Sequence, residues 1–168
     1  EVEHWDGLHR HVDAGDDALV AVLRALGVGL SGPAEADGAL RRAGLAAWDR
    51  GVEASSVTWR GDAPSMRLRF READAGRRVR VTLAPEGEAA APRVVDAVLG
   101  ELTRTDAADV EGVRFLEATL PLGDPLEDGR HLATVDGIGA APLRQRVLAA
   151  PRAAFTRPEA ERGWGVFV

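Results

Sequence analysis

The sequence predicts an α+β protein, in which a short N-terminal helical segment is followed by an antiparallel β-sandwich. Before Gly51 the apolar residues recur at helical spacing, and after it they recur at every second position in short runs. Gly, Asp and Pro separate these runs at intervals of roughly 10–15 residues, which favours an antiparallel sandwich over a parallel sheet. We therefore divide the chain into a helical lead (residues 1–52), a sandwich (53–150) and a linker (151–168).

The helical lead contains two predicted helices. Asp16 or Asp17 can begin the first helix, and Gly27 can end it in a left-handed conformation. Its apolar stripe consists of Leu19, Val22, Leu23 and Leu26. The second helix starts after Ser31, and its small and apolar face comprises Leu40, Gly44, Ala47 and Trp48. We expect the first helix to pack on this face, around Trp48.

The predicted strands begin after Gly51. Residues 66–70 alternate apolar side chains with arginine, and residues 79–83 repeat the alternation after the turn-like segment 72–76. Two alternating runs joined by a short turn predict a β-hairpin. Further strands are expected at residues 57–60, 94–103, 113–120, 130–135 and 144–149.

The predicted hairpin would place five arginines on one face of two paired strands. They are Arg67, Arg69, Arg71, Arg78 and Arg80. Like charges opposite one another destabilise a sheet unless other groups answer them, so this face is a candidate interaction face for an anionic ligand or an acidic partner. We favour the simpler alternative, a solvated face whose charges are answered by Asp96, Glu101 and Glu117.

The composition excludes several function classes. The chain has 168 residues and a formal net charge of −6, which argues against a nucleic-acid partner. It has no cysteine, and therefore no disulfide, thiolate ligand or cysteine nucleophile. The apolar runs are shorter than the ~20 residues of a membrane span, so we expect a cytoplasmic protein without membrane contact. The sequence lacks an initiator Met and ends on the apolar residues 164–168, from which we expect a piece of a longer protein.

No motif in the sequence nominates a catalytic centre. The glycines of residues 27–32 follow a helix rather than a strand, which indicates a helix end and not a phosphate-binding loop. The serines have no nearby histidine with an orienting acid, and no carboxylate pair can be nominated for glycoside chemistry. We predict no cofactor and no metal site at His4, His9 and His11, whose spacing matches no compact ligand pair. His131 is expected at a strand edge.

Tryptophan is the side chain on which a sugar ring can stack. Trp59, which lies on a predicted strand between Thr58 and Arg60, is the best placed candidate for glucan contact, and Trp5 in the lead segment is a second. For Trp59 itself we favour a place in the core over contact with a sugar. Trp48 is better explained by helix packing.

The order of several segments resembles bacterial 4-α-glucanotransferases of the amylomaltase type. Residues 6–7, 17–28 and 39–48 resemble the start of that family. Leu120-Pro-Leu-Gly123, followed by Gly129-Arg-His-Leu132, resembles the family's "LPLGYHxL" strand. Ala150-Pro-Arg152 and Trp164-Gly-Val166 resemble the passage that leads into its catalytic barrel. Residues 124–128 are inserted where the family has Tyr-His, so no function of that turn is carried over.

The resemblance implies a helical lead and a β-sandwich that precede a (β/α)₈ barrel. In that family the barrel carries the nucleophile and the acid that move 1,4-α-glucan segments between maltooligosaccharides, and neither residue maps onto this sequence. We therefore expect a non-catalytic accessory region whose parent chain is the enzyme. Its expected partner is the catalytic barrel of that parent chain, and α-1,4-glucan is a second candidate. An independent carbohydrate-binding module and a protein-interaction sandwich are the alternatives.

Overall fold

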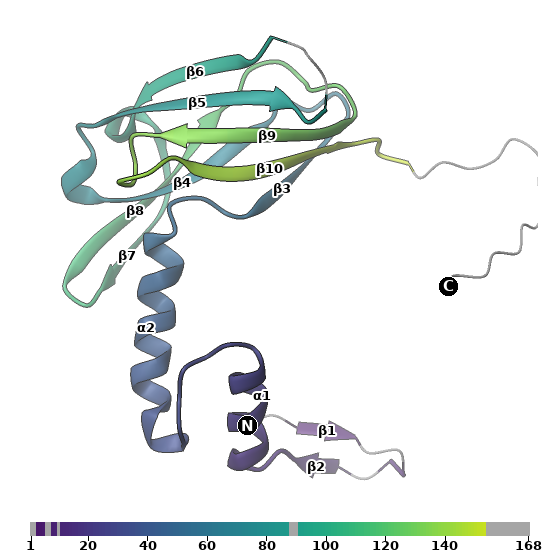
Figure 1. Cartoon of the computed structure of the whole chain (residues 1–168), viewed down its shortest axis with the longest axis vertical. Helices are drawn as coiled ribbons and strands as arrows, with labels where there is room; N and C mark the ends of the chain where they lie inside the picture. Colours follow the sequence, from purple (N-terminus) through teal and green to yellow (C-terminus); the bar gives the residue numbers. More distant parts are fainter. Residues whose placement is uncertain (1–2, 6–7, 10, 88–90, 154–168) are drawn as a thin grey trace, which may run out of the picture.

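The computed structural model describes residues 3–5, 8–9, 11–87 and 91–153. It confirms the α+β class, because a helical N-terminal part is joined to a sandwich of two β-sheets (Figure 1). Most of the predicted linker, residues 154–168, lies outside the described range. Within that range no helix has the length and mean hydropathy needed to cross a membrane.

The helical lead consists of two short strands and two α-helices. Strands β1 (Glu3–Trp5) and β2 (His11–Asp13) form an antiparallel pair that was not predicted. Helix α1 spans Asp16–Ala25 and stops ahead of Gly27, whose φ of 84° confirms the predicted left-handed end. A single 3₁₀ turn, η1 (Pro33–Glu35), leads into α2 (Ala36–Asp49). In Figure 1, α2 reaches from the sandwich to the rest of the lead, so α1 and the β1–β2 pair lie remote from the sheets.

The predicted packing of the first helix around Trp48 is wrong. The lead has its own small cluster, made of the buried residues Val20, Leu30 and Ala39. Trp48 lies at the other end of α2, where its ring centroid is 6.2 Å from that of Phe115 in the sandwich. Because the sandwich occupies Trp48, the predicted apolar stripe of α1 remains largely uncovered: Val22 is 56% exposed and Leu26 is 75% exposed.

The sandwich contains a five-stranded and a three-stranded sheet. The first has the order β3 (Ser55–Trp59), β10 (Leu143–Ala150), β9 (Gly129–Asp136), β5 (Arg78–Pro85) and β6 (Arg93–Val98). The second has the order β4 (Ser65–Arg71), β8 (Val113–Pro121) and β7 (Thr103–Val110). Among the described strands, only β3 and β10 pair in parallel. The edge strands β3 and β4 therefore follow one another in the chain but belong to different sheets.

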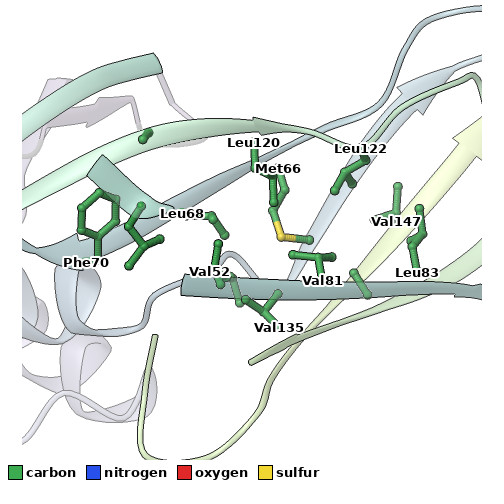
Figure 2. Packing of buried hydrophobic residues seen from close by; sticks show 14 of the residues in the cluster. Val52, Met66, Leu68, Phe70, Val81, Leu83, Leu120, Leu122, Val135 and Val147 are labelled. Atoms are coloured by element: carbon green, nitrogen blue, oxygen red, sulfur yellow. The ribbon is translucent and has the colours of Figure 1, made fainter. Parts of the chain in front are cut away.

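The predicted hairpin of residues 66–83 is wrong, although its alternation is correct. Strand β4 pairs with β8, whereas β5 pairs with β6 and β9. The 3₁₀ turn η2 (Glu72–Asp74) carries the chain from one sheet to the other. The apolar positions of both strands point into the common core, as Figure 2 shows for Met66 and Val81. The two runs face each other across the sandwich instead of lying side by side.

The predicted strand 94–103 is two strands. Strand β6 ends at Val98, the 3₁₀ turn η3 (Leu99–Glu101) turns the chain, and β7 begins at Thr103. Strand β7 was not predicted beyond its first residue, because its sequence is polar on both faces and it is an edge strand. The register shift between Arg104 and Asp106 marks a bulge in β7. The remaining predicted strands are confirmed as β3, β8, β9 and β10.

Candidate functional site

The five candidate arginines lie on two separate faces, so the single interaction face is wrong. Arg67, Arg69 and Arg71 stand on the outer side of β4, and Arg78 and Arg80 stand on the outer side of β5. The two sheets pack through their inner sides, so the whole core separates the two groups. Alternation within each strand places these side chains outward, but the assignment of the strands to different sheets keeps them apart.

Arg69 joins α2 to the three-stranded sheet. Its Nε donates to Oε2 of Glu117 at 2.9 Å, and its Nη1 lies 2.8 Å from Oε1 of Glu53. Its guanidinium lies 5.4 Å from the ring centroid of Trp48. The Glu117 side chain is only 8% exposed and also accepts a hydrogen bond from Oγ1 of Thr105, the bulged residue of β7. This buried cluster fixes the end of α2 on the sheet.

Two other arginines also form ion pairs with acidic side chains. Arg71 pairs with Asp49 at 3.0 Å, and Arg80 pairs with Asp96 at 2.8 Å. The hydrogen bond from Arg80 lowers the pKa of Asp96. The expected roles of Asp96 and Glu117 are confirmed, whereas Glu101 forms no ion pair with any residue of the described segments. Arg67 and Arg78 have no ion-pair partner in that part of the chain.

Trp59 is exposed, so the favoured prediction that it lies in the core is wrong. It lies on the edge strand β3 with 47% of its surface exposed, and Val57, two residues earlier on the same face, is 55% exposed. Leu148 of β10 is the register partner of Val57 and is 37% exposed. We call Val57, Trp59 and Leu148 the Trp59 row. The side chain of Trp5, the second candidate, lies outside the described part of the structure.

Ion pairs surround the Trp59 row. Arg130, the register partner of Leu148, lies 3.6 Å from a carboxylate oxygen of Glu86, and Arg146 donates to the other oxygen at 3.2 Å. Arg60, which follows Trp59, binds Asp128 through two hydrogen bonds, and these lower the pKa of the Asp128 carboxyl. An apolar centre with a polar rim is typical of contact surfaces.

His131 is buried, so its predicted place at a strand edge is wrong. Strand β9 is the middle strand of the five-stranded sheet, and only 5% of His131 is exposed. Its Nε2 donates to the carbonyl oxygen of Glu127 at 2.8 Å. The turn of residues 124–128 is held further by Arg93, whose Nη1 donates to the carbonyl oxygens of Leu122 and Asp124. We assign His131 to the support of this turn.

The candidate metal ligands are only partly described. The side chain of His4 lies outside the described residues. Among the described residues, no group of three or more His, Asp or Glu side chains could hold a metal ion.

Sequence reasoning missed several residues near the Trp59 row. Val57 and Leu148 look like ordinary strand residues, and only the pairing of β3 with β10 brings them together. Gln145 was also missed, although it is the only glutamine of the chain and stands in β10 where the alternation expects an apolar side chain. That polar interruption of an apolar pattern is a signal that could have found it.

The fold and this surface define a β-sandwich protein with a helical N-terminal segment and an apolar, charge-rimmed outer face. No protein-family model matches the chain, and no curated protein sequence matches it. Among solved structures, it is similar to the polymeric Ig receptor ectodomain of a teleost fish, with 13% sequence identity and a TM-score of 0.30. The match covers 61% of this chain and 48% of the receptor chain. A TM-score of this size identifies neither a fold family nor a function.

Proposed function

We propose that this chain is a non-catalytic accessory region of a 4-α-glucanotransferase and that it docks on the catalytic barrel of the same parent chain. The observation that carries the proposal is the uncovered apolar stripe of α1. In the family that the sequence resembles, the helical lead and the sandwich precede a barrel. We therefore take that barrel as the surface that covers the stripe. The barrel's substrate, 1,4-α-glucan, is the substrate class of the whole enzyme.

The helical lead is poorly covered as it stands. Val22, Leu23 and Leu26 of α1 are between 37% and 75% exposed, and Leu40 of α2 is 73% exposed. Isolated helices shorter than about 12–15 residues are marginal in water, so the ten residues of α1 need tertiary packing. Covering the stripe with a partner surface would contribute about 25 cal/mol for each Å² of apolar area removed from water. This supports docking of the lead on a second apolar surface.

The one buried carboxylate of the described residues, Glu117, supports a non-catalytic role. Retaining glucan transfer needs two carboxyl groups about 5–5.5 Å apart on either side of the scissile bond. Glu117, a buried carboxylate, is already bound to Arg69 and Thr105. A carboxylate held in this way has its oxygens committed to the fold and not to a substrate.

The first test separates the accessory role from catalysis. We expect the 168-residue chain to release no glucose from maltotriose, whereas the segment encoded directly after it should disproportionate maltotriose. Glucose release by the 168-residue chain alone would overturn the non-catalytic role. A downstream segment without disproportionating activity would overturn the assignment to this enzyme class.

The second test addresses docking. Val22→Glu places a charge in the α1 stripe and should weaken association with the separately expressed downstream segment at least tenfold, as measured by isothermal titration calorimetry. Val94→Glu is the matched control, because Val94 is 50% exposed on β6, at the far edge of the sandwich. Equal affinities of the two variants would contradict docking through α1. Sedimentation of the 168-residue chain alone tests whether a second copy covers the stripe instead.

A carbohydrate-binding module is the second candidate, and the exposed Trp59 row favours it. The exposed ring of Trp59, with Val57 before it and Arg60 after it on the chain, offers a flat face to a pyranose ring. We expect the chain to be retarded in affinity electrophoresis through amylopectin, and Trp59→Ala to lose this retardation. Val94→Ala, on the far edge of the same sheet, should migrate like the parent chain. Unchanged migration of Trp59→Ala would eliminate the row as a sugar platform. We do not propose an arginine face, because the arginines point in opposite directions.

A further inference from the structure

A polar groove runs along the seam where the edge strands β3 and β4 of the two sheets approach each other. Its volume is about 410 Å³, within the range of about 300–1,000 Å³ that is usual for small-molecule sites. Hydroxyl and charged side chains dominate its lining. The lining residues are Glu53, Ser55, Ser56, Val57, Ser65, Arg67, Thr119 and Gln145. Val57 also belongs to the Trp59 row, so the groove and the row are continuous along β3.

Gln145 is the unusual member of this lining. It occupies an inward position of β10, where its neighbours Val147 and Ala149 are core residues, and it is 97% buried at 3% exposure. Its Oε1 accepts no hydrogen bond from any group of the described structure. A buried acceptor without a donor costs free energy that an apolar residue would avoid. Oε1 itself has almost no solvent-accessible surface, but Gln145 lines the groove, so a rotation of its side-chain amide brings this acceptor to a bound ligand.

Arg67 supplies the complementary donor. Its guanidinium has no acid partner among the described residues, whereas the neighbouring Glu53 is bound to Arg69 at 2.8 Å. An anion in the groove would meet the carboxylate of Glu53 and the acceptor of Gln145. A cation would meet Arg67. A neutral polyol avoids both conflicts, since each of its hydroxyls can donate to Gln145 and accept from Arg67.

We propose that the β3–β4 groove is a binding site for a neutral, polyhydroxylated ligand, which donates a hydroxyl to Oε1 of Gln145 and accepts from Arg67. Ser55, Ser56, Ser65 and Thr119 offer further hydrogen bonds along the lining. A longer saccharide extends from the groove onto Trp59. The choice of a maltooligosaccharide as that ligand rests on the proposed function, whereas the groove chemistry does not.

The test is a titration of the ¹⁵N-labelled 168-residue chain with maltoheptaose, followed by NMR. Saturable shifts are expected for the side-chain amide of Gln145 and for the backbone amides of residues 55–57. Gln145→Leu should weaken binding about tenfold or more without lowering the melting temperature, because it removes an unpaired acceptor and keeps the side-chain volume. Loss of binding together with unchanged or increased stability separates ligand recognition from a folding defect.

The substitution of Arg67 has a matched control in the same chain. Arg67→Gln should weaken binding several-fold, whereas Arg78→Gln should not, since Arg78 also lacks an ion-pair partner in the described residues but lies on the opposite outer face. Equal affinities of Gln145→Leu and the parent chain would overturn the proposal, and so would shifts at these residues with inorganic phosphate but not with saccharides. Binding of cellohexaose without maltoheptaose would support the groove and contradict the proposed enzyme class. If neither saccharide binds, the proposal that the groove is a binding site would be overturned, and the docking tests would be unaffected.

Discussion

Arg69 Nε donates to Oε2 of Glu117 at 2.9 Å, beneath the C-terminal end of α2. The pair joins β4 to β8, and the same guanidinium donates to the carbonyl oxygen of Ala47 at 3.1 Å. The guanidinium of Arg69 therefore contacts both the three-stranded sheet and the helix that covers it. Because α2 covers this outer side, β8 is buried on both faces from Phe115 to Ala118, which breaks the usual alternation.

Removing one partner of this pair should strongly destabilise the sandwich. Arg69→Met leaves the Glu117 carboxylate buried and without its cation, and breaking a buried pair costs about 3–5 kcal/mol. Urea unfolding monitored by tryptophan fluorescence would measure the loss. Arg71→Met is the control, because the Arg71 and Asp49 side chains are about half exposed and their pair should contribute less than about 1 kcal/mol. A loss for Arg69→Met no larger than that for Arg71→Met would contradict the role of the buried pair.

Gln145→Leu should increase stability. The substitution removes a buried acceptor that has no donor in the described structure and replaces it with an apolar side chain of similar size. Unsatisfied buried polar groups cost about 1–3 kcal/mol, so we expect the free energy of unfolding to rise by about 1 kcal/mol. The measurement is urea unfolding in the absence of saccharide. A decrease of that size would indicate that Gln145 has a structural partner.

Asp96 should titrate below the usual range of an aspartate. The hydrogen bond from Arg80 lowers its pKa, and the charge of Arg78 adds to the effect. Since the pKa is lower in the folded than in the unfolded chain, the pair stabilises the fold above the ordinary aspartate pKa. That contribution is lost as the pH falls through the lowered value. In an NMR titration of the side-chain carboxyl carbon, Arg80→Gln should return the pKa of Asp96 toward its usual value. An unaltered titration curve would rule out the hydrogen bond as the cause.

Gly137→Ala should destabilise the connection between β9 and β10. Gly137 has a φ of 105°, and an added Cβ would lie 2.2 Å from the carbonyl oxygen of Arg78. Both the left-handed backbone and the clash oppose a side chain, so we expect a loss of more than about 1 kcal/mol. Gly76→Ala is the matched control, because a Cβ there meets no atom within 4 Å. Thermal unfolding of both variants measures the difference, and equal melting temperatures would contradict the expectation.

The Trp59 row shows how far sequence reasoning reaches toward the candidate site. Sequence pattern identified Trp59 as the best placed tryptophan, because it stands on a strand between polar neighbours. It could not identify Leu148 as its neighbour, since the two lie 89 positions apart in the sequence and only the parallel pairing of β3 with β10 brings them together. The same pairing brings Gln145 to the groove, although its break in the apolar alternation of β10 is visible in the sequence.

The sequence by itself determined the local structure of several elements. The helix of residues 16–25, its glycine end and the alternation of β4 and β5 depend on interactions within a few residues, and the structure confirms each of them. What only the tertiary structure decided is which elements meet. The alternation that places Arg67 and Arg80 outward assigns each side chain to a face of its strand, but it is equally satisfied by a hairpin and by two strands facing each other across a core. The apolar sides of β4 and β5 meet in that core, and the arginines consequently lie on opposite surfaces of the protein.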